Sequence, residues 1–410
     1  MNPDDPVPEA HLASNDELGA AALDARSSAV WPVQFLPGDD PAAGPEDGSA
    51  LCLSGGGSRA MLFHVGALIR LNELGLLKTL ARVSGVSGGS ITAAMLGLRW
   101  SSLEFDPVTG IASNLGPLVA DPIRSFAGLN IDVAAAIVGV LLPGRSAADQ
   151  IESAFQDHLY GDATLQDLPA DADGPRFIFN ATNLGSGVLW RFSRPYAWDW
   201  RVGKIANPTF RIATAVAASA AFPPFFAPLE LDVEPGMFSP GSGDGKIDTP
   251  EFQHRIRLAD GGVYDNLGLE TIFKRYRTLY VSDGGGGLSD TASPPTDWPR
   301  EILRVMGVID HQVRSLRKRL LIAAYDRGDR NGSYWGIRQT IDEYPVPGAL
   351  PCPTAATVKL ANTPTRLAAM PVAQRNALVN WGYALADAAI RSRSSGFRPP
   401  TDFPYPGGVG

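Results

Sequence analysis

Two glycine-rich stretches decide the fold class of this chain: Leu51-Cys52-Leu53-Ser54-Gly55-Gly56-Gly57-Ser58-Arg59-Ala60 and Val83-Ser84-Gly85-Val86-Ser87-Gly88-Gly89-Ser90. Each one follows a short apolar, strand-like run and opens a helical pattern of apolar residues. Acyl transfer needs an exposed nucleophile and rigidly held backbone N–H donors for the oxyanion, and a strand–turn–helix junction can supply either. Two such junctions so close together therefore indicate an enzyme.

The second stretch contains a Gly-x-Ser-x-Gly pentapeptide with Ser87 at its centre. The pentapeptide alone is a weak signal, but Leu80–Val83 before it is typical of a strand end, and Ile91–Trp100 after it resumes a helical pattern. Gly85 and Gly89 would flank a sharp turn with no room for side chains, and the Ser87 hydroxyl would lie at a helix N-terminus, whose dipole favours negative charge. The alternative interpretation is a Gly/Ser-rich surface turn.

The run Gly55-Gly56-Gly57 has several interpretations. It could hold a phosphate at the start of a helix near Ala60, as dinucleotide-binding folds do. However, it lacks the Gly-x-Gly-x-x-Gly spacing with a following acidic residue, and it lacks Gly-Lys-Ser/Thr. An oxyanion loop fits better, because backbone N–H groups do the work there and glycine lets a tetrahedral centre approach. A tight strand–helix connection without chemistry stays as the alternative.

Four stretches resemble, in the same order, the motifs of the patatin-like phospholipase family. The glycine run followed by Arg59 and the serine pentapeptide are the first two. The third and fourth are Ala218-Ser219-Ala220-Ala221-Phe222-Pro223-Pro224-Phe225-Phe226, similar to the family's Ala-Ser-x-Ala-x-Pro-x-x-Phe block, and Leu258-Ala259-Asp260-Gly261-Gly262-Val263-Tyr264-Asp265-Asn266, similar to its Asp-Gly-Gly/Ala element. The resemblance spans about 51–270, with similar strands expected as far as Asp283.

The resemblance implies a three-layer α/β/α sandwich with a mainly parallel central sheet, and a Ser–Asp dyad that works without a catalytic histidine, a metal or a cofactor. By position, Ser87 would be the nucleophile and Asp260 the base. The oxyanion hole would lie on the loop formed by Gly55, Gly56, Gly57, Ser58 and Arg59. The chain departs from the family at Ala60, where glycine is usual, and this matters only if that position needs a positive φ.

The residues leave two alternatives open for the dyad. The five histidines are His11, His64, His158, His254 and His311. A lone histidine is more often packed or solvated than catalytic, but a triad in the order Ser87, Asp260, His311 is the alternative site. Asp283 follows a strand-like run and is a second candidate carboxylate. It ranks below Asp260 because the family's downstream asparagine is matched by Asn266.

Composition and charge predict the domain organisation. The chain has 410 residues, of which 44% are hydrophobic, enough for one large or two small domains. Residues 1–50 hold ten acidic residues against the single Arg26, whereas the remainder is close to neutral. We expect an acidic flexible N-terminal arm over 1–49, a catalytic domain over 50–290, and a helical and loop-rich extension over 291–410 that packs on it. The oligomeric state is not predicted.

Several patterns bear on location and partners. The sequence has no apolar run of about 18 residues and no secretory pattern at Met1–Asp5, and Cys52 and Cys352 make no disulfide framework. The cytoplasm is therefore the expected location, and transient contact with a membrane surface stays open. The apolar stretch 131–143 is interpreted as a core helix, with a cap over an acyl pocket or an interfacial patch as the alternative. The nearly neutral body disfavours nucleic acid as a partner.

Three further segments have an ordinary and a functional interpretation. Residues 240–251 overlay the later positions of an EF-hand loop, but Pro240 would occupy the first ligand position, so a turn-rich insertion is favoured over a calcium site. Residues 222–229 with their three prolines predict a rigid connection, or the mouth of a site. The basic residues of 314–319 are interpreted as a solvated helix face, with contact to anionic lipid headgroups as the alternative.

The expected activity is release of fatty acids from phospholipids or related lipid esters through an acyl-enzyme. The alternatives are a carboxylesterase or lysophospholipase that acts on single-chain esters, and an inactive lipid-binding protein, for which Ala60 is the sole support. An unperturbed aspartate titrates near pH ~4, so the dyad should lose activity below that pH. A group that titrates near ~6.5 would favour the histidine triad.

Overall fold

The computed structural model describes residues 45–131, 147–223, 228–365 and 367–410. Contacts along the chain separate Met1–Gly44 from Pro45–Gly410, and all the elements below belong to the second unit. Parts of three segments interpreted from the sequence lie outside the described residues: the acidic arm as far as residue 44, residues 132–143 of the apolar stretch, and residues 224–227 of the proline-rich segment.

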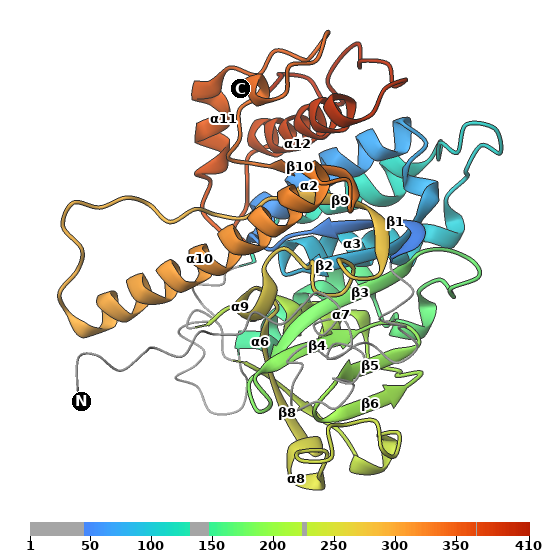
Figure 1. The fold of residues 1–410 in the computed structure, drawn as a ribbon, viewed down its shortest axis with the longest axis vertical. Helices are drawn as coiled ribbons and strands as arrows, with labels where there is room; N and C mark the ends of the chain where they lie inside the picture. Colours follow the sequence, from blue (N-terminus) through green and yellow to red (C-terminus); the bar gives the residue numbers. More distant parts are fainter. Residues whose placement is uncertain (1–44, 132–146, 224–227, 366) are drawn as a thin grey trace, which may run out of the picture. The chain divides into compact units, whose positions relative to one another are not determined.

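A ten-stranded sheet forms the centre of the fold (Figure 1). Its strands lie in the order β10-β9-β1-β2-β3-β4-β5-β6, while β8 pairs with both β3 and β7. The strands are β1 (Glu46–Leu53), β2 (Leu80–Val86), β3 (Arg176–Asn183), β4 (Val188–Phe192), β5 (Tyr196–Asp199), β6 (Gly203–Ala206), β7 (Leu229–Asp232), β8 (Arg255–Asp260), β9 (Tyr276–Asp283) and β10 (Asn331–Gly336).

The sheet is mixed. Strands β10, β9, β1, β2 and β3 run parallel, and every pair beyond β3 is antiparallel. The expected α/β three-layer sandwich is confirmed, but its parallel part occupies one half of the sheet. The connections explain part of this arrangement: helical crossovers link the parallel strands, whereas the short turns that join β3, β4, β5 and β6 in sequence allow only antiparallel neighbours.

Alternating side chains of β1 face two different cores, which defines the layers. Leu51 and Leu53 belong to the large core that contains the helices α2 (Gly57–Glu73), α3 (Gly88–Arg99) and α12 (Val372–Arg393). Ala50 and Cys52 point to the other face, into a smaller core with Leu321 and Tyr325 of α10 (Trp298–Asp326). Because successive strand residues face opposite sides of a sheet, these cores lie on opposite faces.

The described residues also form the helices α4 (Asp121–Phe126), α6 (Ala147–Phe155), α7 (Ile212–Ala220), α8 (Pro250–Gln253), α9 (Gly262–Asp265) and α11 (Thr354–Ala361).

The C-terminal segment is built into the same unit. β10 pairs with β9 in parallel, and α12 packs along α2. A buried ion pair between Arg70 Nη2 and Asp387 Oδ1, 2.7 Å apart, joins the two helices. The Trp381 indole donates to the carbonyl oxygen of Ile337 at 3.0 Å. The sequence predicted an extension packed on the domain but did not indicate a strand that completes its sheet.

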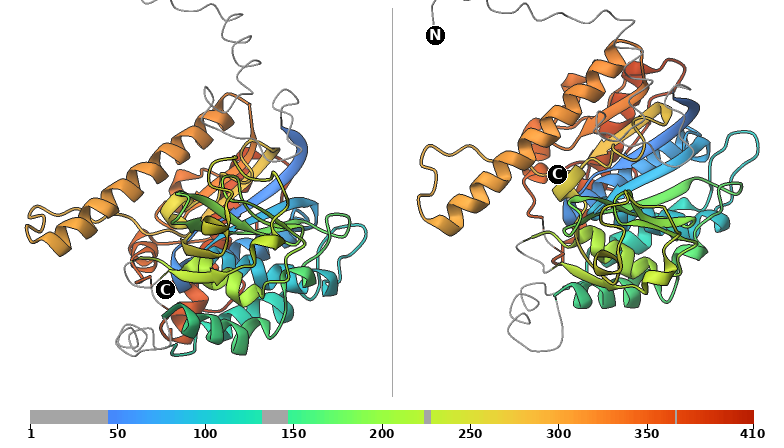
Figure 2. Two further views of the ribbon diagram at one scale, coloured as in Figure 1. Left: turned by 90° about the horizontal axis from the view of Figure 1, so that it is seen from below. Right: turned by 60° about the horizontal axis from the view of Figure 1, so that its bottom comes forward.

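α10 is the longest helix of the described part of the chain, with 29 residues. Its C-terminal half lies on the sheet, and its N-terminal half extends beyond it (Figures 1 and 2). Among the described residues, no helix combines the length and the apolar character that crossing a bilayer requires.

Candidate functional site

Ser87 lies at a sharp turn between β2 and α3. Its backbone has φ 51° and ψ −119°, and within the described ranges only Asn207 is another non-glycine residue with positive φ. Such a conformation costs of order 1–3 kcal/mol and persists only where the surroundings impose it. Its side chain stays partly accessible, since 9% of the residue is exposed. The predicted strand, turn and helix around Ser87 are therefore all present.

The turn forms because helix α3 starts directly against the end of β1. A Cβ atom on Gly89 would lie 2.0 Å from the carbonyl oxygen of Leu53, so no side chain fits there. Gly85 lies in β2, where a Cβ atom would come within 2.7 Å of Ser90 Cα. The two predicted elbow glycines thus allow the close approach that the turn needs.

Ser219 of α7 holds the turn from the other side. Its Oγ accepts a hydrogen bond from the backbone N–H of Ser87 at 3.0 Å and donates to the carbonyl oxygen of Asn180 at 2.6 Å. Ser90 Oγ lies 2.8 Å from Ser219 Oγ. Ser219 is matched to a motif from the sequence but has no predicted role. The signal that could have found it was a serine in a mostly apolar helix.

Asp260 is brought to Ser87 by the register of β3. Val86 is paired with Asn180, and the next residue of β3, Ala181, is paired with Asp260 at the end of β8. Ser87 directly follows β2 and Asp260 is the last residue of β8, so the two residues meet beside β3. The Asp260 side chain interacts with the side chain of Ser87. The carboxylate also accepts a hydrogen bond from the N–H of Gly262 at 2.7 Å.

The environment of Asp260 changes its acidity. Burial raises the pKa of its carboxyl group to about 7, and the negative charge of Asp310 adds to the rise. The hydrogen bonds with the Gly262 N–H and the Ser87 side chain act in the opposite direction and are outweighed. The pH near 4 expected for an unperturbed aspartate therefore does not apply to this site.

The glycine loop runs beside Ser87 and opens α2. Gly57 has φ 61°, a value that side chains disfavour, and is the first residue of the helix. Gly56 and Gly57 are partly exposed, and in the described ranges no acceptor faces either N–H group. Such unpaired N–H groups at a helix N-terminus attract negative charge. A Cβ atom on Gly55 would lie 3.3 Å from Ser87 Cβ, so this loop adjoins the candidate nucleophile.

The other predicted loop residues have different surroundings. The N–H of Gly55 donates to the carbonyl oxygen of Asn266 at 3.1 Å and is already used. Ser58 is buried in the first turn of α2. The Arg59 side chain turns away, donating to the carbonyl oxygens of Gly284 and Thr363 at 3.2 and 2.7 Å, and burial lowers its pKa to about 10. Accessible N–H groups thus concentrate at Gly56 and Gly57.

Two further observations concern the sequence motifs. Ala60 lies within α2 and is not among the described residues with positive φ, so alanine meets no conformational obstacle there. Asn266 connects the glycine loop to the Asp260 turn. Asn266 Oδ1 lies close to both segments. A Cβ atom added to Gly55 would lie 2.3 Å from this oxygen, and one added to Gly262 would lie 2.6 Å from it. The sequence analysis used Asn266 only as a family match.

The histidines lie apart from the Ser87–Asp260 pair. His64 is buried, donates through Nε2 to the carbonyl oxygen of Ser54 at 2.9 Å, and has a pKa lowered to about 4 by burial. His158, His254 and His311 are exposed, and His11 lies outside the described residues. Across the described ranges, no histidine hydrogen-bonds to Ser87 or Asp260.

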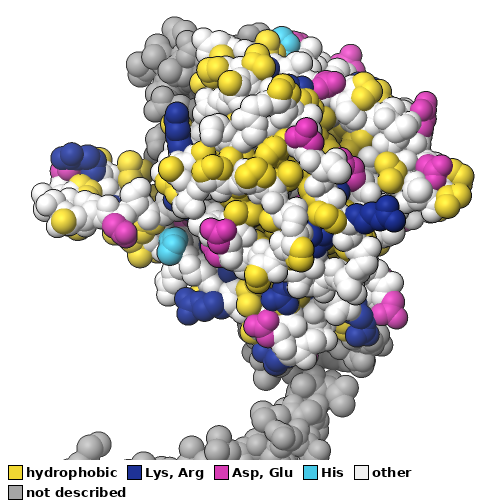
Figure 3. Space-filling view, turned by 90° about the horizontal axis from the view of Figure 1, so that it is seen from above, with side chains coloured by type: hydrophobic (Ala, Val, Ile, Leu, Met, Phe, Trp, Pro, Cys, Tyr) yellow, Lys and Arg dark blue, Asp and Glu magenta, His cyan; other side chains and the backbone are white. Residues whose placement is uncertain are grey.

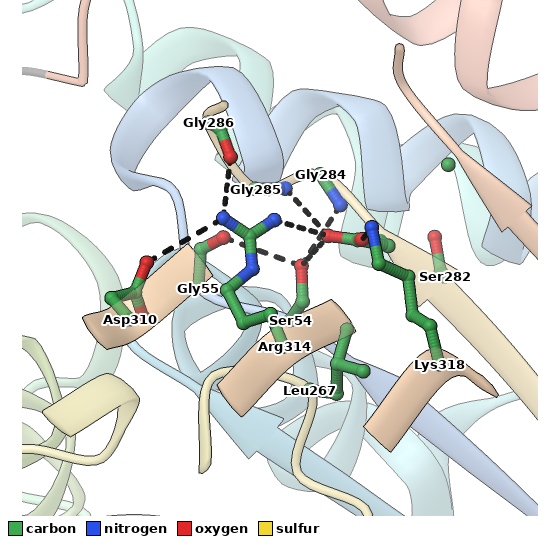
Figure 4. A network of polar contacts seen from close by, with 12 residues as sticks. Ser54, Gly55, Leu267, Ser282, Gly284, Gly285, Gly286, Asp310, Arg314 and Lys318 are labelled. Atoms are coloured by element: carbon green, nitrogen blue, oxygen red, sulfur yellow. Dashed lines mark hydrogen bonds and ion pairs between the residues drawn. The ribbon is translucent and has the colours of Figure 1, made fainter. Parts of the chain in front are cut away.

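Asp283, the second candidate carboxylate, is the centre of a polar network. Figure 4 shows three members of this network, Ser54, Arg314 and Lys318. Asp283 accepts hydrogen bonds from the Tyr334 hydroxyl at 2.8 Å and from Ser54 Oγ and Arg314 Nη2, both at 3.3 Å. Lys318 Nζ lies 3.7 Å away. Burial alone would raise the pKa of Asp283, but the cations Arg314 and Lys318 and the hydrogen bonds hold it well below its usual range. The Asp283 carboxylate is therefore ionised and already hydrogen-bonded, and its bond with Ser54 holds the start of the glycine loop in place.

A calcium loop is the alternative interpretation of residues 240–251, but a carboxylate in this segment is already engaged by other groups. Asp244 accepts hydrogen bonds from the N–H groups of Lys246 and Ile247 at 2.8 and 3.0 Å and pairs with Arg201 at 3.1 Å. Within the described ranges, no group of three or more His, Cys, Asp or Glu side chains could hold a metal ion.

The fold and the three loops define an α/β protein with a serine at a strand–helix elbow, a buried aspartate beside it and free N–H groups at a helix N-terminus. The family model of patatin-like phospholipase matches residues 51–273, more than half of the chain, and the chain belongs to this family. Membership supports a lipid ester hydrolase as the class of activity.

Solved structures similar to this chain have low sequence identity. Human GIVD cytosolic phospholipase A2 in complex with methyl gamma-linolenyl fluorophosphonate is 16% identical over 85% of this chain and 60% of that one, with a TM-score of 0.46. VipD from Legionella pneumophila is 16% identical over 85% of this chain and 67% of that one, with a TM-score of 0.33. The chain spans about half to three-fifths of the human structures it matches. No curated protein sequence matches it.

Proposed function

We propose that this protein is a serine acyl hydrolase that releases fatty acids from phospholipids or related lipid esters with Ser87 and Asp260 as a catalytic dyad. The observation that carries the proposal is the strained backbone of Ser87 beside a buried carboxylate whose pKa is raised to about 7. Strained residues and perturbed pKa values cluster at functional sites. Membership of the patatin-like phospholipase family supports the lipid substrate.

In the first half of the reaction, Ser87 Oγ attacks the ester carbonyl carbon while Asp260 accepts the hydroxyl proton. A base with a pKa near the working pH is ionised often enough to act and basic enough to take the proton. The carbonyl oxygen becomes an oxyanion, which accepts hydrogen bonds from the free N–H groups of Gly56 and Gly57. The tetrahedral intermediate then collapses, the C–O bond breaks, and Asp260 returns the proton to the departing alcohol.

In the second half, water attacks the acyl group on Ser87 and Asp260 takes a proton from that water. The same N–H groups stabilise the second oxyanion. Collapse breaks the bond to Ser87 Oγ, which regains its proton from Asp260, and the fatty acid leaves. The dyad performs both steps without a histidine, in keeping with the exposed position of His311 and its lack of a bond to either residue in the described ranges.

The test is labelling with a fluorophosphonate, followed by peptide mapping, alongside fatty-acid release from phospholipid and lysophospholipid. Ser87→Ala should lose both label and hydrolysis, Asp260→Asn should lose hydrolysis, and His311→Ala should keep both. Removing the base or nucleophile should cost at least about 10³-fold in kcat. Loss of hydrolysis in His311→Ala would instead establish the triad, and a folded wild-type protein without label or hydrolysis would contradict the enzyme. The preferred lipid would distinguish phospholipase A from lysophospholipase.

A further inference from the structure

The N-terminal half of α10 leaves the body of the protein (Figures 1 and 2). Its large apolar side chains are exposed to solvent. The C-terminal half of α10 is anchored by Leu321, Ala324 and Tyr325, which are buried against the sheet. In contrast, Trp298 is 73% exposed and Ile309 is 55% exposed. An apolar surface of this kind on a projecting element marks a site of interaction.

The exposed apolar residues form a stripe along the whole helix. They recur at intervals of three, four or seven residues, the spacing of one helical face: Trp298, Ile302, Val305, Ile309, Leu316 and Leu320. The side that packs on the sheet is a different one, since Leu321 and Tyr325 lie about 100° or more away from the centre of the stripe. The stripe therefore faces away from the protein core.

In the projecting half the apolar surface is wider than a single stripe. Met306 and Val308 are also exposed and lie to either side of it, and Leu303 is exposed on the side of the helix that Leu321 occupies further along. The polar side is correspondingly narrow and includes Arg300, Glu301 and Arg304. A two-helix seam needs only a narrow apolar stripe, whereas a broad apolar face opposite a narrow polar one is typical of a helix that lies in a membrane interface. A terminal tryptophan fits the same location, because its ring is apolar and its N–H is polar.

Two arginines on α10, unpaired among the described residues, favour an anionic surface. The helix contains six Lys and Arg residues and three Asp and Glu residues, and four of the six cations pair with carboxylates. Arg304 and Arg319 have no carboxylate partner in the described ranges, and their hydrogen bonds go to the carbonyl oxygens of Ser289 and Ser315. Figure 3 shows hydrophobic, basic and acidic side chains on the arm that projects at the left of the view. Anionic headgroups would neutralise the charges of these two arginines.

The anchored part of α10 lies beside the candidate site. Arg314 and Lys318 pair with Asp283, which accepts the hydrogen bond from Ser54 at the start of the glycine loop. The charge of Asp310 raises the pKa of Asp260. A surface bound along α10 would therefore be held next to the loops that carry Ser87.

We propose that α10 is an interfacial helix through which the protein docks on an anionic lipid bilayer, with the stripe inserted among the lipids and its unpaired arginines on the headgroups. The docking would bring lipid to the site described above, and this role rests on the proposed function. The binding itself does not depend on catalysis.

Vesicle binding of a Ser87→Ala protein tests the docking without turnover. Sedimentation is measured with vesicles of phosphatidylcholine and with vesicles of phosphatidylcholine mixed with phosphatidylserine. The double variant Ile302→Ser/Ile309→Ser should bind mixed vesicles at least about tenfold more weakly, because two apolar side chains no longer enter the bilayer. The matched control Val108→Ser/Val372→Ser changes two exposed apolar residues outside α10 and should bind like the parent. Unchanged binding by the α10 variant overturns the proposal.

A second pair of variants tests the charges. Arg304→Gln/Arg319→Gln should weaken binding to mixed vesicles by about fivefold for each charge removed and leave the weaker binding to pure phosphatidylcholine unchanged. Lys246→Gln/Lys359→Gln, which removes two exposed lysines outside α10, is the control. Thermal unfolding shows whether each variant is folded.

Two outcomes separate this proposal from its alternatives. If sedimentation equilibrium shows a dimer that Ile302→Ser/Ile309→Ser dissociates while vesicle binding persists, the stripe is a contact between copies and the docking is refuted. If wild-type protein binds mixed vesicles through the stripe but neither takes up a fluorophosphonate nor hydrolyses any ester, the docking stands and the proposed enzymatic function fails.

Discussion

The backbone N–H of Ser87 donates to Ser219 Oγ at 3.0 Å, although the two residues are 132 positions apart in the chain. Ser219 in turn donates to the carbonyl oxygen of Asn180 in β3. One hydroxyl on α7 therefore ties the strained turn between β2 and α3 to the strand that also pairs with β8. The position of the candidate nucleophile relative to Asp260 depends on this link.

Ser219→Ala tests that link. The substitution leaves the N–H of Ser87 buried without an acceptor, which should cost about 1–3 kcal/mol of stability. We expect kcat to fall about tenfold or more with little change in KM, because the nucleophile is displaced while lipid contacts remain.

Ser90→Ala is the matched control for Ser219→Ala. It removes the neighbouring hydroxyl, 2.8 Å from Ser219 Oγ, but leaves the bond from Ser87 to Ser219 in place. Equal losses of kcat in the two variants would show that the link to Ser87 has no special role.

The pH dependence of hydrolysis should follow Asp260. Because the base must be ionised and its pKa is raised to about 7, kcat/KM should fall as the pH drops through about 7. An inflection at this pH resembles that of a histidine, so the pH profile alone cannot identify the group.

Asp310→Asn identifies the titrating group. Removing the negative charge of Asp310 should lower the pKa of Asp260 and move the acidic limb of the profile to lower pH, by less than about one pH unit because Asp310 is the weakest of the four influences. His311→Ala should leave the limb where it is. A limb that moves only in His311→Ala would point to the histidine.

Asp260→Asn should stabilise the fold while it abolishes hydrolysis. Since burial raises the pKa of Asp260 from 3.8 to about 7, the ionised form destabilises the folded state, and stability is lost as the pH rises from about 4 to about 7. The neutral amide avoids this penalty. The free energy of unfolding of the variant should therefore exceed that of the wild type by up to about 4 kcal/mol at pH 8 and by nearly nothing at pH 4. Urea unfolding of both proteins at the two pH values measures the difference. Equal stability at pH 8 would contradict the raised pKa.

Asp283→Asn should act in the opposite direction on stability. The pKa of Asp283 is held below its usual range by Arg314 and Lys318, so its contribution is present at neutral pH and is lost as the pH falls below about 4, the value in the unfolded chain. The variant removes the closer of two carboxylates paired with buried Arg314 and leaves Asp310 at 3.7 Å, and we expect a loss of about 3 kcal/mol at pH 7. Chemical unfolding at pH 7 measures it. The control Asp329→Asn breaks the exposed pair with Arg327 and should cost less than about 1 kcal/mol.

Gly89→Ala should prevent the elbow from forming. The added methyl group would lie 2.0 Å from the carbonyl oxygen of Leu53, so strand and helix would have to separate, at a cost above about 3 kcal/mol. Gly116→Ala is the control, because nothing lies within 4 Å of its added methyl group and its φ is negative. Yield of folded protein and the unfolding midpoint distinguish the two. A folded, stable Gly89→Ala protein would refute the packing at the elbow.

Local pattern was sufficient for the parts of the fold that depend on neighbours in sequence. The junctions before α2 and α3 follow from apolar runs and glycines that lie within a few positions of one another. The strand β10 escaped prediction because its sequence, Asn331–Gly336, has little strand character and becomes a strand only through its pairing with β9.

The sequence by itself determined which residues are candidates: the serine between two glycines, the glycine run, and the aspartate of a matching motif. Tertiary structure alone decided what those residues can do. The register of β3 brings Asp260 to Ser87, burial sets the acidity of the carboxyl group, and the bond from Gly55 to Asn266 leaves Gly56 and Gly57 with the free N–H groups. Contacts between distant segments control these properties because desolvation and hydrogen bonding depend on what surrounds a group in space.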